Sequence, residues 1–268
     1  MTRASQLAAA LLLAVAAGCS NPDPAQKLTN VVPGTGFSVH TVKSGGSDHK
    51  YSVFIPRNYN KNTKYPTVIF LHGIGEAGSD GVKSRTVGIG PAIGKRNGDF
   101  PFIVLFPQAG WDWTSQSSGQ LVMDVLHDAE KSYSIDQDRV ILTGMSSGGK
   151  GVWVLGARYV DVWSALVPMG SYPSYDDVQT LTRLPIWALH NDGDFIVPVG
   201  GTREMVKRIK AAGGNIKYSE FDAGGHNCWD AAYDQGELFV WLQQQRRNPA
   251  NAAGGKGAGG GTAAPAKK

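Results

Sequence analysis

The feature that most constrains the fold is a serine placed between a short β-branched run and a helical pattern. Residues 139–151 read Arg-Val-Ile-Leu-Thr-Gly-Met-Ser-Ser-Gly-Gly-Lys-Gly, so glycines stand two positions before and two positions after Ser146. This pattern is typical of a strand, a sharp turn and a helix, because a Cβ at either glycine would collide with the facing backbone. The turn puts Ser146 at the end of the strand. There the free N–H groups of the following helix point toward whatever the serine attacks.

A glycine-flanked serine can also arise by chance in a chain with 35 glycines. The alternative interpretation is a glycine-rich turn whose serine only caps a helix. Apolar residues on both sides favour a nucleophile instead, since Val140-Ile141-Leu142 is typical of a buried strand and residues 152–155 can form an apolar helix face. Partners for the serine further along the chain must decide between the two.

One folded domain is expected from 268 residues with 41% hydrophobic content. The net charge of +4 is unevenly placed, because six of the 26 basic residues lie near the chain ends: Arg3, Arg246, Arg247, Lys256, Lys267 and Lys268. Removing these six leaves 20 basic residues against 22 acidic ones in the body. A nearly neutral body gives no indication of a nucleic-acid partner.

The first 18 residues are interpreted as an export signal. They begin with a positive end, continue with an apolar run from Leu7 to Ala17, and are too short for a membrane-spanning helix. Ala16-Ala17-Gly18-Cys19 resembles a bacterial lipobox, which implies a lipid on Cys19; Ala16 replaces the usual leucine, so ordinary cleavage stays open. Ser20 in place of an aspartate favours the outer membrane or cell surface. If Cys19 is not lipidated, a periplasmic or secreted protein is expected. If it is lipidated, the lipid is the only expected contact with the membrane.

Composition divides the rest of the chain into three parts. Residues 19–36 are polar and contain prolines, as a tether would. Residues 37–245 form the predicted catalytic domain, and the Gly/Ala/Lys-rich residues 246–268 are predicted to be disordered. If Cys19 carries lipid, Cys228 has no partner for a disulfide and is best interpreted as a small buried side chain.

Strands alternate with helices through the predicted domain, which indicates a mostly parallel sheet covered by helices on both faces. Ligands bind such sheets beyond the carboxyl ends of the strands. The expected strands are residues 37–42 and 51–56 as an edge hairpin, then 65–72, 102–107, 140–142, 165–169, 185–189 and 216–221; the expected helices are residues 118–133, 202–212, 233–245 and one after Ser146.

A serine nucleophile needs a base, and the base needs an acid to orient it. His226 is the candidate base, because it follows the last strand within Gly-Gly-His-Asn, although a plain surface histidine would fit the same place. Asp194 is the preferred acid, since Val197-Pro198 would fix the loop just after it. Asp192 precedes a glycine and fits a turn. Asp222 follows a different strand and is the third alternative.

Two backbone N–H groups are predicted to hold the oxyanion, those of Ile74 and Ser147. His72-Gly73 ends a strand, where the imidazole would brace the loop and leave the Ile74 N–H free. Losing one such donor typically costs about 3 kcal/mol of transition-state stabilisation. The histidines show no short ligand spacing of the kind zinc sites use, so neither a metal nor another cofactor is expected.

The order Ser146, Asp194, His226, with Leu71-His72-Gly73 upstream, resembles the α/β-hydrolase superfamily. Within this superfamily, the chain is similar to a branch of secreted bacterial esterases. That branch contains feruloyl and acetylxylan esterases, polyhydroxybutyrate depolymerase-like enzymes and proteins labelled as peptidases. That similarity rests on Asp138-Arg139-Val140, residues 190–194 with Val197-Pro198, and Gly224-Gly225-His226-Asn227-Cys228-Trp229. The resemblance implies the α/β-hydrolase fold over residues 37–245 and a serine carboxylesterase acting on polysaccharide-linked feruloyl or acetyl groups, as in plant polysaccharides, or on polyester.

Departures from the family pattern refine this expectation. Ile74-Gly75-Glu76 replaces the triple glycine of many lipases. The chain also lacks a long insertion after the sixth strand that could form a large lid, so an open cleft is expected. Trp111 and Trp113 are predicted either to form a platform for a sugar or phenolic group or to anchor their loop in the core. Two alternatives stay open, a serine peptidase with the same three residues and a non-catalytic lipoprotein that recognises glycan.

Overall fold

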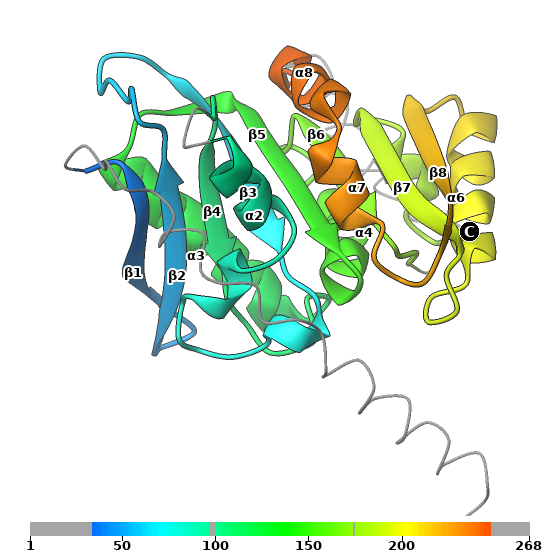
Figure 1. Cartoon of the computed structure of the whole chain (residues 1–268), viewed down its shortest axis with the longest axis horizontal. Coiled ribbons are helices and arrows are strands. Elements are labelled where there is room, and N and C mark those ends of the chain that lie inside the picture. The colour runs from blue at the N-terminus through cyan, green and yellow to red at the C-terminus, as the bar shows by residue number, and fades with distance from the viewer. Residues whose placement is uncertain (1–33, 97–99, 174, 248–268) are drawn as a thin grey trace, which may run out of the picture.

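An eight-stranded sheet organises the computed structural model, which describes residues 34–96, 100–173 and 175–247 (Figure 1). The strand order is β1-β2-β4-β3-β5-β6-β7-β8. β1 and β2 are antiparallel to their neighbours, whereas β4, β3 and β5 to β8 are parallel. The strands are β1 (Gly36–Ser44), β2 (Ser47–Ile55), β3 (Tyr65–Leu71), β4 (Ile103–Pro107), β5 (Ile135–Met145), β6 (Ala165–Met169), β7 (Ile186–Gly193) and β8 (Ile216–Gly224).

Helices cover both faces of this sheet. α3, α4 and α6 pack on one face, and α2, α7 and α8 on the other, where they stand in front of the sheet in Figure 1. The helical segments are η2 (Ile74–Glu76), η3 (Lys83–Arg85), α2 (Ile89–Lys95), α3 (Gln116–Ser132), α4 (Ser147–Arg158), α5 (Val178–Leu181), α6 (Val199–Ala211), α7 (Trp229–Asp234) and α8 (Gly236–Gln244). The central strands are buried on both faces, which explains why their sequences are continuously apolar.

The edge hairpin has the expected position and turns through two glycines. Gly45 and Gly46 have φ values of 56° and 86°, and Ser44 pairs with Ser47. A two-residue turn with positive φ at both positions matches the twist of the strands it joins, and glycine adopts it at little steric cost.

Among the helices that cover the two faces of the sheet, two regions differ from the sequence-based expectation. The predicted helix over residues 233–245 is two helices, because Gln235 has an extended backbone (φ −71°, ψ 117°) that ends α7 and starts α8. α2 was not predicted, since two glycines and a proline in seven residues give it weak helix propensity. Burial of Ile89, Ala92 and Ile93 against the sheet stabilises α2 nonetheless.

The folded domain extends at least two residues beyond the predicted boundary at residue 245. Arg247 donates its backbone N–H to the carbonyl of Asp138 at 2.7 Å and its guanidinium to the Asp138 carboxylate at 2.9 Å. Arg246 lies 3.2 Å from the carboxylate of Asp136. The prediction of a disordered tail from residue 246 is therefore wrong for its first two residues, because acidic side chains at the start of β5 hold them.

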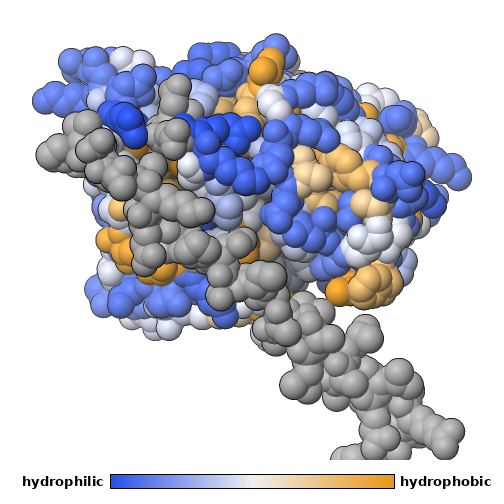
Figure 2. Space-filling model, viewed as in Figure 1, coloured by the Kyte–Doolittle hydropathy of each residue, from blue (hydrophilic) through white to orange (hydrophobic). Residues whose placement is uncertain are grey.

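The predicted signal over residues 1–18, the lipidated Cys19, most of the tether over residues 19–36 and the tail from residue 248 lie outside the described residues. Within the described part of the chain, no helix is both long enough and apolar enough to cross a membrane. Figure 2 shows that hydrophilic side chains dominate the visible face, with apolar side chains in smaller groups among them.

Candidate active site

The turn between β5 and α4 holds Ser146 in a rare backbone conformation. Its φ of 55° and ψ of −121° make it the one described non-glycine residue with positive φ. A Cβ on Gly144 would lie 2.7 Å from the carbonyl oxygen of Gly148, and a Cβ on Gly148 would lie 2.1 Å from that of Leu71. Only glycine fits at either position. The close approach of α4 to the end of β3 thus fixes the serine at the carboxyl edge of the sheet.

His226 joins Ser146 to a buried carboxylate. The Ser146 Oγ lies 2.8 Å from His226 Nε2, and His226 Nδ1 lies 2.6 Å from Asp194 Oδ2. Since a carboxylate only accepts hydrogen bonds, Nδ1 carries the proton and the Nε2 lone pair faces the serine hydroxyl. Trp229 packs edge-on against the imidazole, with ring centroids 5.2 Å apart. This arrangement can move the serine proton to His226.

Asp194, rather than Asp192, contacts the histidine. The Asp194 side chain is fully buried, and its Oδ1 accepts the backbone N–H groups of Ile196 and Val197, each at 2.9 Å. These bonds fix the carboxylate plane so that Oδ2 faces His226. Asp192 is exposed and accepts the backbone N–H of Ala223 at 3.1 Å, which is a structural role in joining β7 to β8.

The loop after β3 lies against the nucleophile. A Cβ on Gly73 would be 3.6 Å from the Ser146 Cβ, so the Ile74 backbone that follows is close to the serine. Ser147 is the first residue of α4, where helical geometry leaves the N–H groups without intrahelical acceptors. The two N–H groups predicted as oxyanion donors therefore come from segments that meet at Ser146.

His72 braces this loop in its neutral form. Its Nδ1 donates to the carbonyl of Gly73 at 2.7 Å, and its Nε2 accepts the backbone N–H of Ala109 at 3.3 Å. Burial lowers the pKa of His72 to about 4, because the interior disfavours the imidazolium. His72 is thus held away from the serine and supports the backbone, as the sequence indicates.

The two tryptophans after β4 have different positions. Trp113 is fully buried and donates its indole N–H to the carbonyl of His72 at 3.0 Å, so it anchors the loop and cannot form an exposed platform. Trp111 is 66% exposed and remains available. Sequence reasoning missed Phe195, which is 73% exposed in the loop after β7, directly next to Asp194. An aromatic residue beside a candidate acid was the available signal.

Sequence reasoning also missed two buried residues behind Asp194. His190 Nε2 lies 3.1 Å from Asp194 Oδ2, and His190 Nδ1 lies 2.7 Å from the hydroxyl of Thr202. Both side chains are almost completely enclosed. The spacing of four residues between His190 and Asp194 was visible in the sequence, but the direction of the imidazole was not.

Cys228 is a buried side chain beneath the histidine loop. Its thiol lies 3.6 Å from the carbonyl of Leu189, and burial raises its pKa to about 12. A thiol in that state supplies very little thiolate at neutral pH. Among the described residues, no three His, Cys, Asp or Glu side chains gather as a metal ion would require.

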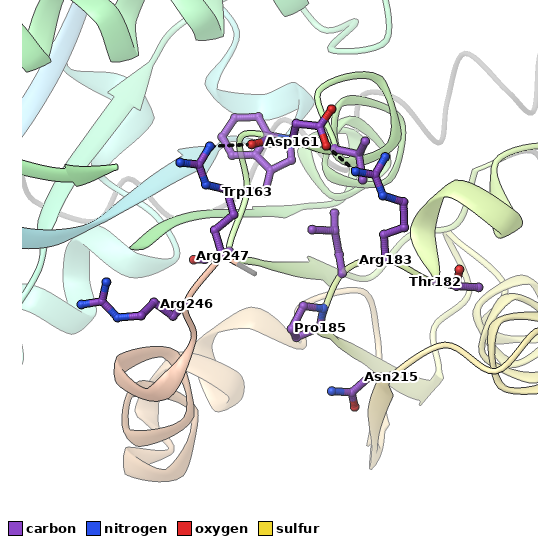
Figure 3. Close-up of a pocket in the computed structure, with 11 residues that line it drawn as sticks. Asp161, Trp163, Thr182, Arg183, Pro185, Asn215, Arg246 and Arg247 are labelled. Atoms are coloured by element: carbon purple, nitrogen blue, oxygen red, sulfur yellow. Dashed lines mark hydrogen bonds and ion pairs between the residues drawn. The ribbon is translucent and has the colours of Figure 1, made fainter. Parts of the chain in front are cut away.

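A separate cavity of about 220 Å³ lies at the amino ends of β6, β7 and β8 (Figure 3). Arg183, Arg246 and Arg247 line it together with Asp161. The guanidinium of Arg183 binds the Asp161 carboxylate, and that of Arg247 donates to the Asp161 carbonyl at 2.9 Å. This cavity is not part of the serine site, which stands at the carboxyl ends of the strands.

Comparisons with known proteins agree with this fold. No family model matches the sequence. The chain is 27% identical over 248 residues to an uncharacterized secreted protein of Arthroderma benhamiae, with 76% of this chain and 25% of the relative covered. It is 23% identical over 157 residues to a bifunctional acetylxylan esterase/xylanase of Neocallimastix patriciarum, with 57% and 22% covered. The chain thus spans about a quarter of the length of these curated relatives.

Several solved structures match this chain over a larger share of their own length than the curated relatives do. A thermostable esterase superposes with a TM-score of 0.70 at 27% identity, over 79% of this chain and 63% of that chain. The feruloyl esterase module of Clostridium thermocellum gives 0.60 at 19% identity, over 84% and 92%. The acylaminoacyl peptidase of Pyrococcus horikoshii gives 0.62 at 11% identity, over 80% and 43%. The chain therefore has the α/β-hydrolase fold, and the solved structures that are similar to it include both esterases and peptidases.

Proposed function

We propose that this protein is a serine carboxylesterase that cleaves its substrate through an acyl-enzyme. The observation that carries the proposal is the continuous hydrogen-bonded series from the Ser146 hydroxyl through His226 to Asp194, with lengths of 2.8 and 2.6 Å. A hydroxyl, an imidazole and a buried carboxylate in this order are the groups that acyl transfer requires.

In the proposed mechanism, Ser146 Oγ attacks the ester carbonyl while His226 Nε2 takes the hydroxyl proton. Asp194 stabilises the imidazolium that forms, and the N–H groups of Ile74 and Ser147 donate to the oxyanion. His226 then gives its proton to the departing alcohol, which leaves an ester between the acyl group and Ser146. Water attacks this ester, His226 removes the water proton, and the carboxylic acid is released with the hydroxyl of Ser146 restored.

The proposed substrate is an acyl group on a polysaccharide, feruloyl or acetyl, or else a polyester. Three exposed apolar side chains support an aromatic or aliphatic acyl group: Ile74 after β3, Trp111 after β4 and Phe195 after β7. These strands lie on both sides of β5, so the apolar side chains flank Ser146. Among the similar proteins, one is named an acetylxylan esterase/xylanase, and the feruloyl esterase module was solved with sinapinate.

The proposed location is outside the cytoplasm, with Cys19 lipidated and the domain tethered to the outer membrane or cell surface. The lipobox-like residues 16–19 and the export-signal pattern before them support this location. The similar protein of Arthroderma benhamiae is named as secreted. Mass spectrometry of the mature amino terminus from membrane fractions tests the proposal, since an unmodified Cys19 or cleavage elsewhere would contradict it.

Hydrolysis of short nitrophenyl esters by the wild-type protein and by Ser146→Ala tests the activity. The variant should lose several orders of magnitude in turnover while its circular dichroism and unfolding transition stay close to wild type. A fluorophosphonate probe should label wild type at Ser146 and leave the variant unlabelled. Near-normal ester cleavage by Ser146→Ala would remove the proposal, and failure of the probe on wild type would favour a non-catalytic glycan-recognition protein.

A serine peptidase is the second candidate, favoured by the shared fold of the acylaminoacyl peptidase. A panel of acetylated xylan, feruloylated arabinoxylan, hydroxyalkanoate oligomers, casein and aminoacyl substrates separates the candidates. Release of acid from the esters without peptide cleavage supports the esterase, whereas faster cleavage of the peptides supports the alternative.

A further inference from the structure

Two imidazoles share the carboxylate of Asp194. Oδ2 of that carboxylate lies 2.6 Å from His226 Nδ1 and 3.1 Å from His190 Nε2. The side chain of His190 has no exposed surface, so it can meet neither substrate nor solvent. The mechanism proposed above assigns no role to His190, although its ring nitrogen touches the same oxygen atom as the base.

The hydrogen-bond partners of His190 define which nitrogen carries its proton. Nε2 faces Asp194 Oδ2 at 3.1 Å and the carbonyl oxygen of Val197 at 2.9 Å. Both are acceptors only, so Nε2 must be protonated. Nδ1 lies 2.7 Å from the Thr202 hydroxyl, which can donate to it. Burial lowers the pKa of His190 and so keeps the ring neutral, with Nδ1 free to accept that hydrogen bond.

The other contacts of Thr202 are consistent with a hydrogen bond donated from its hydroxyl to His190 Nδ1. The Thr202 hydroxyl also donates to the carbonyl oxygen of Ser171 at 2.9 Å, and that oxygen accepts the indole N–H of Trp153 at 3.2 Å as well. Because the Ser171 carbonyl keeps the hydrogen bond from Trp153, Thr202 can share its single proton with His190 Nδ1 without leaving that carbonyl unpaired. A relay results in which Thr202 fixes the tautomer of His190, and His190 donates to Asp194.

We propose that His190 is a positioning residue that donates a second hydrogen bond to Oδ2 of Asp194 and holds this carboxylate toward His226, with Thr202 fixing the proton on His190 Nε2. The inference rests on the proposed roles of Ser146, His226 and Asp194. The donated bond withdraws part of the negative charge from Oδ2, so His190 limits how strongly Asp194 stabilises protonated His226. Its second consequence is geometric, because a carboxylate held on both oxygens cannot rotate away.

The other titratable groups around this pair come from β8 and from the loop after it. Glu220 is paired with His190 across the β7–β8 ladder, and the Arg203 guanidinium binds that carboxylate at 2.6 Å. Hydrogen bonds from Arg203 and Tyr218 lower the pKa of Glu220 to about 2, so it stays charged through the acid range. The buried thiol of Cys228 stays neutral, and its pKa is raised by burial. The acid limb of kcat/KM is therefore the readout that reports on the contact between Asp194 and His226.

The test compares His190→Leu, which removes both ring nitrogens, with His190→Gln, whose side-chain amide can donate from nearly the same position as Nε2. We expect His190→Leu to lower kcat on nitrophenyl acetate by about tenfold, the effect of losing one charge-assisted hydrogen bond. The acid limb of kcat/KM should move upward by roughly half a pH unit, because Asp194 then favours protonated His226 more strongly. His190→Gln should restore most of kcat and the wild-type acid limb.

Val125→Ala on α3 is the matched control, since it removes buried volume far from Asp194. It should lower stability while leaving the acid limb unchanged. If His190→Leu behaves like this control, with kcat falling only in proportion to the folded fraction, His190 is merely a core residue and the inference is wrong. An unchanged kcat in His190→Leu would overturn it equally.

Thr202→Val provides the decisive variant if His190→Leu does not fold. It removes the hydroxyl and should shift the acid limb in the same direction by a smaller amount; an unchanged profile would overturn the inference. The low-field proton resonance of His226 Nδ1–H gives a readout independent of turnover. It should weaken or move in the His190 and Thr202 variants and persist in Ser146→Ala. If wild type shows this resonance and no esterase activity, the proposed function fails while the positioning role is still measured by the resonance.

Discussion

Ser146 and His226 stand 80 residues apart in the chain, yet the serine Oγ lies 2.8 Å from the imidazole Nε2. The sheet makes this contact possible, because β5 and β8 both end at the same edge and their following loops converge there. The serine is positioned by a rigid turn and the histidine by a loop that packs on Trp229. The position of Ser146 is therefore set by the backbone of the turn, and that of His226 by the contacts of its ring with Asp194 and Trp229.

The strained backbone at Ser146 predicts an unusual order of stability among its variants. Glycine adopts φ near 55° with ψ near −121° without a Cβ clash, whereas alanine does not. Ser146→Gly should therefore be more stable than Ser146→Ala by about 1 kcal/mol, although both variants should be inactive. Urea unfolding of the two variants measures the difference. Equal midpoints with equal slopes would show that the turn stores no such strain.

The contrasting contacts of Asp192 and Asp194 predict different losses on substitution by asparagine. Asp194→Asn should lower kcat by several orders of magnitude, because an amide at Oδ2 no longer orients His226 with its proton on Nδ1. Asp192→Asn keeps an oxygen that can accept the Ala223 N–H, so its kcat should stay within about twofold of wild type. Steady-state kinetics on one nitrophenyl ester decides the matter, and a larger loss in Asp192→Asn would reverse the assignment.

The buried neutral His72 predicts that stability falls as the medium becomes acidic. Its pKa is about 4 in the folded protein and 6.5 in the unfolded chain, so between these values only the unfolded chain gains the proton. Unfolding is therefore favoured progressively from pH 6.5 down to about 4, by about 3 kcal/mol in total. Above pH 6.5 both states are neutral and the effect vanishes.

Urea midpoints measured between pH 6.5 and about 4 for wild type and His72→Asn isolate the contribution of His72 to the pH dependence of stability. The asparagine amide can replace the Nδ1 donor to Gly73 but does not titrate, so the variant should show a flatter dependence on pH. Burial also lowers the pKa of His190 and raises that of Glu76, and both effects remain in the variant. Parallel curves for the two proteins would mean that His72 is protonated alike in the folded and unfolded states.

The exposed aromatic residues flanking the serine predict a selective effect on aromatic acyl esters. Trp111→Ala and Phe195→Ala should each raise KM for a feruloyl or cinnamoyl ester several-fold, since each removes one large apolar contact. KM for an acetyl ester should change little, because an acetyl group is too small to reach both rings. Val240→Ala on α8 is the control, as another exposed apolar residue outside the loops at this edge. Equal changes for both esters would contradict the proposed contacts.

The sequence predicts the frame of this site well because its strongest signals are backbone constraints. Gly144 and Gly148 are required where α4 approaches β3, and no other residue would fit. Asp194 follows β7, which begins with a continuous apolar run, and His226 follows β8, in which apolar and polar residues alternate. Both patterns indicate strands, so the positions of the two residues at the carboxyl ends could be derived from the order of elements. The choice between Asp192 and Asp194 also had a local basis in the residues that follow each one.

Side-chain direction could not be predicted in the same way. Trp111 and Trp113 differ by two positions in one loop, yet Trp113 is buried against His72 and Trp111 is exposed. His190 looks like any strand-end histidine until its ring is seen to face Asp194. The helix α2 was missed for a related reason, because its burial against the sheet outweighs the weak propensity of its glycines and proline.

Arg247 is fastened to Asp138 at the start of β5, so the chain leaves the domain on the side away from the serine. Material joined after this point, whether a bead, a sensor surface or a second enzyme, would extend from the far side of the sheet. A bulky polymer could then approach the catalytic edge without meeting the support. Attachment directly after Arg247 is accordingly the orientation to choose when the proposed activity is tested on insoluble material with the protein immobilised.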